Sequence, residues 1–318
     1  MKKIIVVSVA FLTAIFFVSC AKSGVYKPKD KINAVWFESE KVTTIDTVSR
    51  TSNTERFLRE EWKWEDKMLR SRTVYRTNGE IRYNYNYEYN SKNKIIGITS
   101  DLSTERKTRI RFIYDDDTKK LKEVKYFTED FSENNLPYKK LEFTYDGNKV
   151  IAIKETVNTH RYPRSYANAE MSLLPFLVSE DMAESIAVNT IHSKVEYDVV
   201  TREYVFEWKK KNISDVTITT TSGGVTSEAR ISYTYDEKRN PQLARVMGYV
   251  EEGSIDCIIC SKNNVVSCNY QEENYSYSEE SQYTYDGKTP IEKVVTRNEK
   301  NSFSTVRVTE KWTYEYEE

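Results

Sequence analysis

The amino-acid sequence predicts an all-β protein: a long antiparallel meander of about 16 strands, curled into a barrel-like or half-barrel sheet. Three observations predict it. Two aromatic residues and a turn recur along the chain, apolar and polar residues alternate before each turn, and aromatic residues are plentiful. The 318 residues include 24 Tyr and 12 Phe but only 9 Gly and 6 Pro. This much aromatic area can form a folded core, which excludes a disordered chain.

The start of the chain has the order of a secretory signal. Two lysines precede an apolar run (4–18) that is too short to span a bilayer. Its end, FVSC, resembles the lipobox of bacterial lipoproteins, although Phe17 stands where Leu is usual. We therefore expect residues 1–19 to be removed, Cys20 to be lipidated, and residues 20–33 to tether the domain to a membrane. Cleavage near Cys20 without a lipid is the alternative.

The aromatic residue just before each turn marks a repeat of about 25 residues. Trp64, Tyr89 and Tyr114 are 25 residues apart, and Tyr145 follows after 31. In the second half the same position is taken by Trp208, Tyr235, Cys260 and Tyr285, with Tyr314 or Tyr316 in a last half-unit. Each unit has room for two strands of about nine residues, so we expect residues 34–318 to form one repeat-built β domain.

Each unit contains the same local signals. In IRYNYNYEYN the tyrosines share one face of a strand and the polar residues share the other. Asp146-Gly147 is a typical hairpin turn, and Val150-Ile151-Ala152-Ile153 predicts a second alternating strand. The alternation places one set of aromatic residues on a common buried side: Tyr85, Tyr87, Phe112, Tyr114, Phe143, Tyr145, Tyr233, Tyr235, Tyr283 and Tyr285.

One segment interrupts the repeat, an irregular insertion near residues 162–192. It includes RSYANAEMSLLPFLVSEDMAESIAVN, in which Ser179 could cap a short helix. Leu173, Leu174 and Phe176 belong to the least polar run after the signal. We expect residues 166–191 to fold back against the concave aromatic face; an exposed patch for a partner or a membrane surface is the alternative.

The repeated pattern, aromatic-x-Tyr-Asp-x-x-(Gly/Asn)-x-(Leu/Val/Ile)-x-x-(Val/Ile), resembles the YD repeat of Rhs-type proteins. The stretches VFEWKKKNI, SGGVTSEARISYTYD, YTYDGKTPIEKV and KWTYEYE more closely resemble a family of uncharacterised lipoproteins from Gram-negative anaerobes. That resemblance covers residues 62–318 and implies a porin-like β fold without catalytic residues. It also implies a place in the cell envelope, at the outer membrane, on its periplasmic or surface face.

The polar face of the strands argues against a wall that faces lipid. A lipid-facing strand needs an apolar outer face. Opposite the tyrosines of IRYNYNYEYN the residues are Arg, Asn, Asn and Glu. We therefore expect one face of the sheet to meet water and the aromatic face to be buried.

The sequence offers no convincing catalytic or metal site, so we expect no enzymatic activity and no cofactor. His160 and His192 lie beside no nucleophile and have no ligand spacing to the Cys257-x-x-Cys260 pair. Cys260 and Cys268 could instead face each other across a hairpin and form a disulfide in an oxidising compartment, or remain half-buried thiols. A net charge of −1 and export both argue against nucleic acid as a partner.

Three non-catalytic roles remain open. The protein could be a structural scaffold, since Tyr tolerates half-burial in strands. It could hold an apolar or amphipathic ligand, such as a lipid, on its concave Tyr-rich face. Alternatively, it could bind glycans or proteins at the cell surface. In each role the N-terminal lipid would connect the domain to the membrane.

Overall fold

The computed structural model describes residues 31–45, 48–66, 68–102, 107–128, 137–158, 199–239, 261–272, 275–300 and 304–317. These residues form 16 strands. They are β1 (Ile32–Ile45), β2 (Val48–Glu65), β3 (Met68–Tyr75), β4 (Ile81–Tyr89), β5 (Ile95–Leu102), β6 (Lys107–Tyr114), β7 (Leu121–Thr128), β8 (Lys139–Asp146), β9 (Lys149–Asn158), β10 (Val199–Lys209), β11 (Asn212–Ser222), β12 (Val225–Arg239), β13 (Asn263–Glu272), β14 (Tyr275–Asp286), β15 (Thr289–Lys300) and β16 (Ser304–Tyr316). No described segment forms a long apolar helix of the kind that crosses a membrane.

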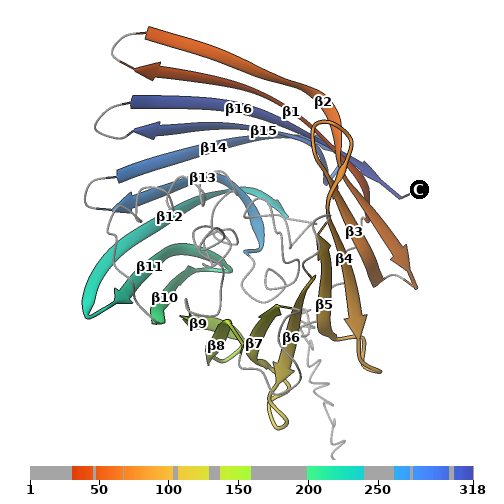
Figure 1. Cartoon of the computed structure of the whole chain (residues 1–318), viewed down its shortest axis with the longest axis vertical. Helices are drawn as coiled ribbons and strands as arrows, with labels where there is room; N and C mark the ends of the chain where they lie inside the picture. Colours follow the sequence, from red (N-terminus) through yellow and green to blue (C-terminus); the bar gives the residue numbers. More distant parts are fainter. Residues whose placement is uncertain are drawn as a thin grey trace, which may run out of the picture.

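The strands close into a barrel, as Figure 1 shows. Each strand pairs antiparallel with the next one along the chain, and β1 pairs with β16 from Ile32↔Tyr316 to Ile45↔Ser304. The all-β antiparallel meander predicted from the sequence is therefore confirmed. Of the two forms that the sequence left open, the barrel is the one observed, and the sheet has no free edge at its ends.

The buried side chains point into the barrel. On β4, Tyr83, Tyr85 and Tyr87 are buried, while the residues between them are not. The wall is a single layer of strands, so a fully buried side chain belongs to its inner face. Among the predicted aromatic residues, Phe112 and Tyr233 are also buried, and the others lie half-buried on the same face: Tyr114, Phe143, Tyr145, Tyr235, Tyr283 and Tyr285.

The 16 strands group into eight two-strand units, and each unit has a β-bulge beside its reference aromatic. In the first unit Trp64 pairs with Leu69 and Lys63 pairs with Ser71, so Arg70 is the extra residue. The extra residues of the other hairpins are Ile96, Lys122, Ile151, Ser214, Val266 and Ile291. A bulge bends the strand and increases its twist, which helps a sheet close.

These bulges correct the expected alternation in the second strand of each unit. Val150 and Ile153, three residues apart, are both fully buried, because the bulge at Ile151 shifts the phase by one residue. The same spacing of buried residues recurs in the other units: Ile32/Val35, Leu69/Arg72, Ile95/Ile98, Leu121/Val124, Ile213/Val216, Val265/Cys268 and Pro290/Lys293. The predicted Asp146-Gly147 turn is present, with Gly147 at φ 53°.

The eighth unit is divided between the two ends of the described chain. Tyr316 of β16 pairs with Ile32 of β1, and the register shifts at Asn33 as it does at the other bulges. Outside this pair, the Glu317 N–H donates to the Lys31 carbonyl at 2.8 Å, and the two side chains form an ion pair. The first strand of the described chain begins at Ile32.

Among the described residues, the unit expected around Cys260 has no hairpin of its own in the barrel wall, because β12 pairs directly with β13 and the two strands form the unit of Tyr235. Residues 240–260 and the 162–192 insertion lie outside the described residues. The stretch around SKNNVVS, predicted to be a hairpin, belongs mostly to the single strand β13. Cys268 in that strand pairs with Tyr233 and Glu279, while Cys260, its predicted disulfide partner, also lies outside the described residues.

The divided eighth unit predicts that the chain tolerates circular permutation. We expect a variant that joins Glu317 to Lys31 through a short Gly-Ser linker, and opens between Gly147 and Asn148, to keep the barrel. The exposed β8–β9 turn then takes the role that the β1–β16 seam has now. Circular dichroism and a denaturation midpoint close to that of the parent would show this. A control opened between Val124 and Lys125, inside β7, should not fold; an unfolded Gly147/Asn148 permutant would contradict the prediction.

Candidate functional site

The inner face of the barrel carries a ring of hydrogen bonds along one rim. In seven of the eight units, the reference aromatic of this rim ring donates to the backbone carbonyl of the residue that precedes the bulge in a neighbouring unit. The contacts are Trp64→Ile32 (2.7 Å), Tyr89→Leu69 (2.7 Å), Tyr114→Ile95 (2.7 Å), Tyr145→Leu121 (2.8 Å), Trp208→Val150 (2.8 Å), Tyr235→Ile213 (2.6 Å) and Tyr316→Pro290 (2.5 Å). Trp64 on β2 contacts Ile32 on β1, and Ile32 pairs across the β1–β16 seam with Tyr316, so the ring also includes the unit at the seam.

The bulges explain why these donors are needed. A bulge disrupts the ladder of backbone hydrogen bonds, and the residues whose carbonyls accept in the rim ring, such as Leu121 and Val150, are buried. A buried carbonyl without a donor costs about 1–3 kcal/mol. A Tyr hydroxyl or a Trp indole supplies that donor, whereas Phe cannot. This requirement accounts for Tyr or Trp at each position of the rim ring.

The rim ring changes at the β14 unit. Tyr283, not Tyr285, donates to the Val265 carbonyl, at 3.1 Å. The Tyr285 hydroxyl donates to Asp236 Oδ2 at 2.5 Å and accepts from Asn264 Nδ2 at 2.7 Å. Burial, and then the hydrogen bond to Asp236, raise the pKa of Tyr285. The Asp of the Tyr-Asp pair in β12 therefore anchors the next aromatic unit along the chain.

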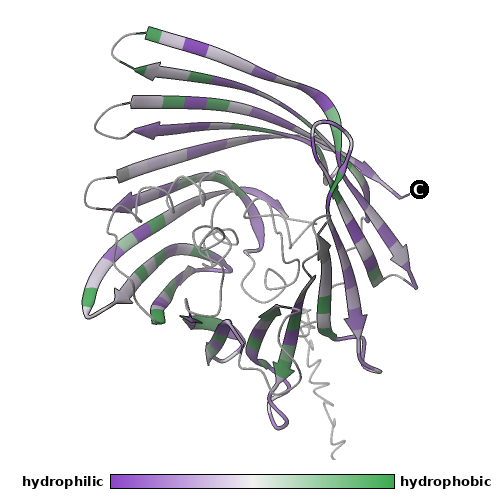
Figure 2. Cartoon of the chain, in the orientation of Figure 1, coloured by the Kyte–Doolittle hydropathy of each residue, from purple (hydrophilic) through white to green (hydrophobic). Residues whose placement is uncertain are grey.

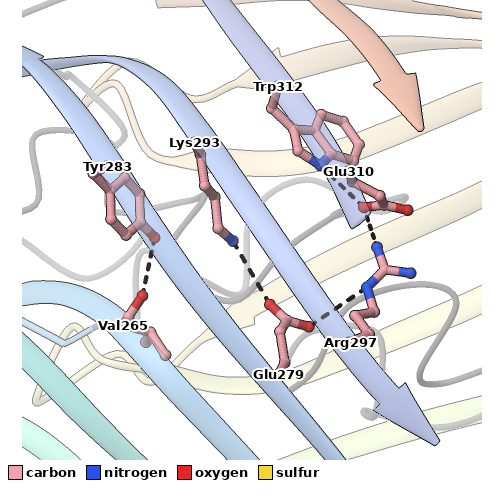
Figure 3. Close-up of polar contacts among 7 residues, drawn as sticks. All are labelled: Val265, Glu279, Tyr283, Lys293, Arg297, Glu310 and Trp312. Atoms are coloured by element: carbon pink, nitrogen blue, oxygen red, sulfur yellow. Dashed lines mark hydrogen bonds and ion pairs between the residues drawn. The ribbon is translucent and has the colours of Figure 1, made fainter. Parts of the chain in front are cut away.

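The inner wall also carries a charged cluster on β14, β15 and β16 (Figure 3). Glu279 lies 3.8 Å from both Lys293 and Arg297, and Arg297 also forms an ion pair with Glu310. The Trp312 indole donates to Glu310 at 3.1 Å. The four charged side chains are buried and alternate in sign, so each carboxylate lies beside a cation.

A similar arrangement recurs on β2 and β3. Glu60 and Arg72 form a fully buried ion pair at 3.2 Å, and the Trp62 indole donates to Glu60 at 2.7 Å. Glu60-x-Trp62 and Glu310-x-Trp312 are thus the same local motif on strands β2 and β16, the two neighbours of β1. These residues are not among those predicted from the sequence, although the stretches EEWKWE and EKWTYE contain the signal.

The third cluster joins β9 and β10. Glu155 accepts from Arg202 at 3.2 Å and from the Tyr204 hydroxyl at 2.9 Å. Buried ion pairs of this kind add little net stability, because desolvation offsets their attraction, but losing one partner leaves a costly buried charge. The ion pairs favour one register of neighbouring strands. In all three clusters each carboxylate is paired with a cation of the wall.

The side chains of the predicted aromatic face form hydrogen bonds with the barrel wall or pack in its core. The hydroxyls of Tyr114, Tyr145, Tyr235 and Tyr283 donate to backbone carbonyls. Phe112 and Phe143 lie two residues before Tyr114 and Tyr145 on the same faces of β6 and β8. They carry no hydroxyl; Phe112 belongs to the core and Phe143 packs against it. The arrangement supports a structural use of this face.

The remaining predicted residues give no chemical site in the described part of the chain. Burial raises the pKa of the Cys268 thiol well above its usual value, and this is the one cysteine among the described residues. Three or more His, Cys, Asp or Glu side chains do not gather in a metal-binding geometry anywhere in the described residues. Cys20, Cys257, His160 and His192 lie outside them.

Comparisons with known proteins give structural neighbours at low sequence identity. No protein-family model matches the chain, and no curated protein matches it in sequence. A porin-like protein from Bacteroides vulgatus matches in structure with a TM-score of 0.40 and 12% identity, over 87% of this chain and 97% of that chain. One from Bacteroides uniformis matches with a TM-score of 0.38 and 10% identity, over 93% and 100%.

The class that the fold defines is a closed, 16-stranded antiparallel β-barrel. That assignment rests on the strand pairing of this chain. It does not depend on the two structural neighbours, whose likeness is distant.

The buried tyrosines predict a loss of stability at alkaline pH. Burial raises the pKa of Tyr233 and Tyr283 well above the ordinary value of 10.0. Above pH 10 the unfolded chain therefore loses protons that the folded chain keeps, so the stabilisation is complete below pH 10 and falls as the pH rises. We expect the urea midpoint to fall between pH 9 and pH 11, and to fall less in Tyr283→Phe. A midpoint that stays constant to pH 11 would contradict this.

Proposed function

We propose that the protein is a lipid-anchored, non-catalytic β-barrel of the cell envelope, with a structural or binding role. The observation that carries the proposal is the division of the wall into two faces. The inner face is occupied by the rim ring, the apolar core and paired charges. The outer face of the described strands is mainly polar, which favours contact with water.

In the described strands, the outer face carries mainly polar side chains and only scattered exposed apolar ones such as Val205 and Ile291, unlike the apolar band of a lipid-facing barrel. On β4 the outward residues are Arg82, Asn84, Asn86 and Glu88, none of them buried or apolar. Hydrophilic and hydrophobic residues are interleaved along the strands in Figure 2. A charged residue that faces lipid near the middle of a bilayer costs about 2–4 kcal/mol. Attachment through a lipid on Cys20 is therefore a better explanation of membrane association than insertion of the wall.

The anchor would be attached at one end of the barrel. Lys31 lies next to Ile32, whose carbonyl is part of the rim ring. Residues 20–31 can extend over at most roughly 40 Å, so the anchor would hold the rim-ring end within that distance of the membrane. The opposite rim, which includes the β1–β2, β11–β12 and β15–β16 ends, would be further from the point of attachment and accessible to ligands or other proteins.

The rim ring bears on the choice between the binding roles. An apolar or amphipathic ligand on the concave Tyr-rich face would share that face with side chains that already bond to the wall. This favours the structural role for the inner face. Glycan or protein binding, if it occurs, then belongs to the polar outer surface, at the outer membrane or elsewhere in the envelope.

The test of the anchor is the Cys20→Ser variant, expressed with its signal in a Gram-negative host. We expect the wild type in the detergent-soluble membrane fraction and the variant in the soluble periplasmic or extracellular fraction, with an unchanged circular dichroism spectrum. Metabolic labelling with a radioactive fatty acid should mark only the wild type. A folded variant that remains in the membrane pellet, or a wild type without label, would contradict lipid anchoring.

A further inference from the structure

The outer wall of the barrel contains a polar hollow that none of the features described above explains. It has a volume of about 340 Å³ and spans β12, β13, β14 and β15. Its lining consists mainly of residues with hydroxyl, amide or cationic side chains: Arg230, Ser232, Asn269, Gln271, Ser276, Ser278, Asn298 and Lys300. Tyr270 and Tyr277, whose side chains are buried in the core, also border it. The volume lies within the range of small-molecule sites, about 300–1,000 Å³.

The strand register arranges these side chains in two straight rows across the sheet. One row runs through Arg230, Gln271, Ser276 and Lys300, which are cross-strand partners in that order. The parallel row runs through Ser232, Asn269, Ser278 and Asn298. Neighbouring strands lie about 4.8 Å apart, so each row spans roughly 14 Å.

The hollow results from residue size. The outward residues of β14 in these rows are both serines, Ser276 and Ser278, while longer side chains flank them on β13 and β15. Small side chains between longer ones leave a depression in an otherwise convex wall. Arg230 and Lys300 stand at opposite ends of one row, on β12 and β15.

The chemistry of the hollow suits an anion that carries hydroxyl groups. None of its lining residues is a carboxylate. Arg230 bonds to Asp215, on β11 beyond the hollow, at 2.8 Å, yet its side chain remains 60% exposed. The Asn269 amide nitrogen donates to Ser267 and that of Gln271 donates to the Glu272 carbonyl, which uses one of the two N–H groups of each amide and leaves the amide oxygens as acceptors. Those oxygens can accept from ligand hydroxyls, and the serines can both donate and accept.

We propose that this hollow is a binding site for an acidic oligosaccharide, with Arg230 and Lys300 holding its anionic groups and the amide and serine rows holding its hydroxyls. The site rests on the binding role within the proposed function, and it places that role on the outer wall. Arg230 and Lys300 lie on strands with two others between them, and this separation fits an extended chain with more than one anionic unit better than a single small anion.

The test uses the full-length chain with Cys20→Ser, purified from the soluble fraction, and isothermal titration calorimetry. The probes are oligogalacturonate, which carries carboxylates, dextran sulfate, which carries sulfates, and neutral dextran. We expect one of the two acidic probes to bind, dextran not to bind, and affinity to fall as ionic strength rises. Which acidic probe binds distinguishes the carboxylated from the sulfated class.

Variants show whether binding occurs in the hollow. We expect Lys300→Ala and Arg230→Ala each to weaken binding about tenfold, and Ser278→Trp, which fills the depression, to abolish it. Lys288→Ala is the matched control, because this exposed lysine lies in the β14–β15 turn at the other end of the same strands, and it should bind as the parent does. Circular dichroism confirms folding of each variant. No binding of either acidic probe by the folded parent, or equal losses in Lys288→Ala and Lys300→Ala, would overturn the proposal. Either result would leave the release of Cys20→Ser from the membrane unaffected.

Discussion

The hydrogen bond from an aromatic side chain to the carbonyl beside a β-bulge is the interaction on which the rest of this barrel depends. The bulge supplies the bend that lets 16 strands close, and at the same time it disrupts the backbone ladder. The Tyr hydroxyl or Trp indole of a neighbouring unit then satisfies a buried carbonyl, as Tyr114 does for Ile95. The carbonyl beside each bulge receives its hydrogen bond from a neighbouring unit, so the ring needs all eight units, including the one formed by β16 and β1.

This mutual dependence explains how charges can be tolerated on the inner face. The rim ring and the bulges set the register of neighbouring strands, and that register places Glu60 beside Arg72 and Glu310 beside Arg297. A slip of one residue would separate the partners and leave buried charges uncompensated. The inner face is therefore specified by aromatic and ionic contacts together, and the polar outer face is left available for water and ligands. Both properties are compatible with the proposed attachment of the barrel beside a membrane.

Much of the fold can be predicted from the sequence, because strands and turns depend on local signals. Alternation in IRYNYNYEYN and the Asp146-Gly147 turn were sufficient to predict an antiparallel meander of about 16 strands. The bulges were less apparent, although the apolar-x-x-apolar spacing of Val150 and Ile153 contains them. The sequence predicts a separate unit at Cys260, because CSKNNV resembles the other turns. In the structure β12, which contains Tyr235, pairs directly with β13, and these two strands form one unit. The ion pairs and the rows of the outer hollow depend on register between strands, which one sequence does not display.

The stability of Tyr114→Phe, compared with that of Tyr75→Phe, tests the central claim most directly. Both changes remove one hydroxyl, but Tyr114 donates to the buried Ile95 carbonyl, whereas Tyr75 donates to Glu61, a half-buried carboxylate. Urea denaturation should show that Tyr114→Phe lowers the free energy of unfolding by about 1–3 kcal/mol, because a buried carbonyl loses its donor. Tyr75→Phe should lower it by less than about 0.5 kcal/mol, since water can replace the hydroxyl beside Glu61. Equal and small losses in the two variants would mean that the rim ring does not hold the barrel together.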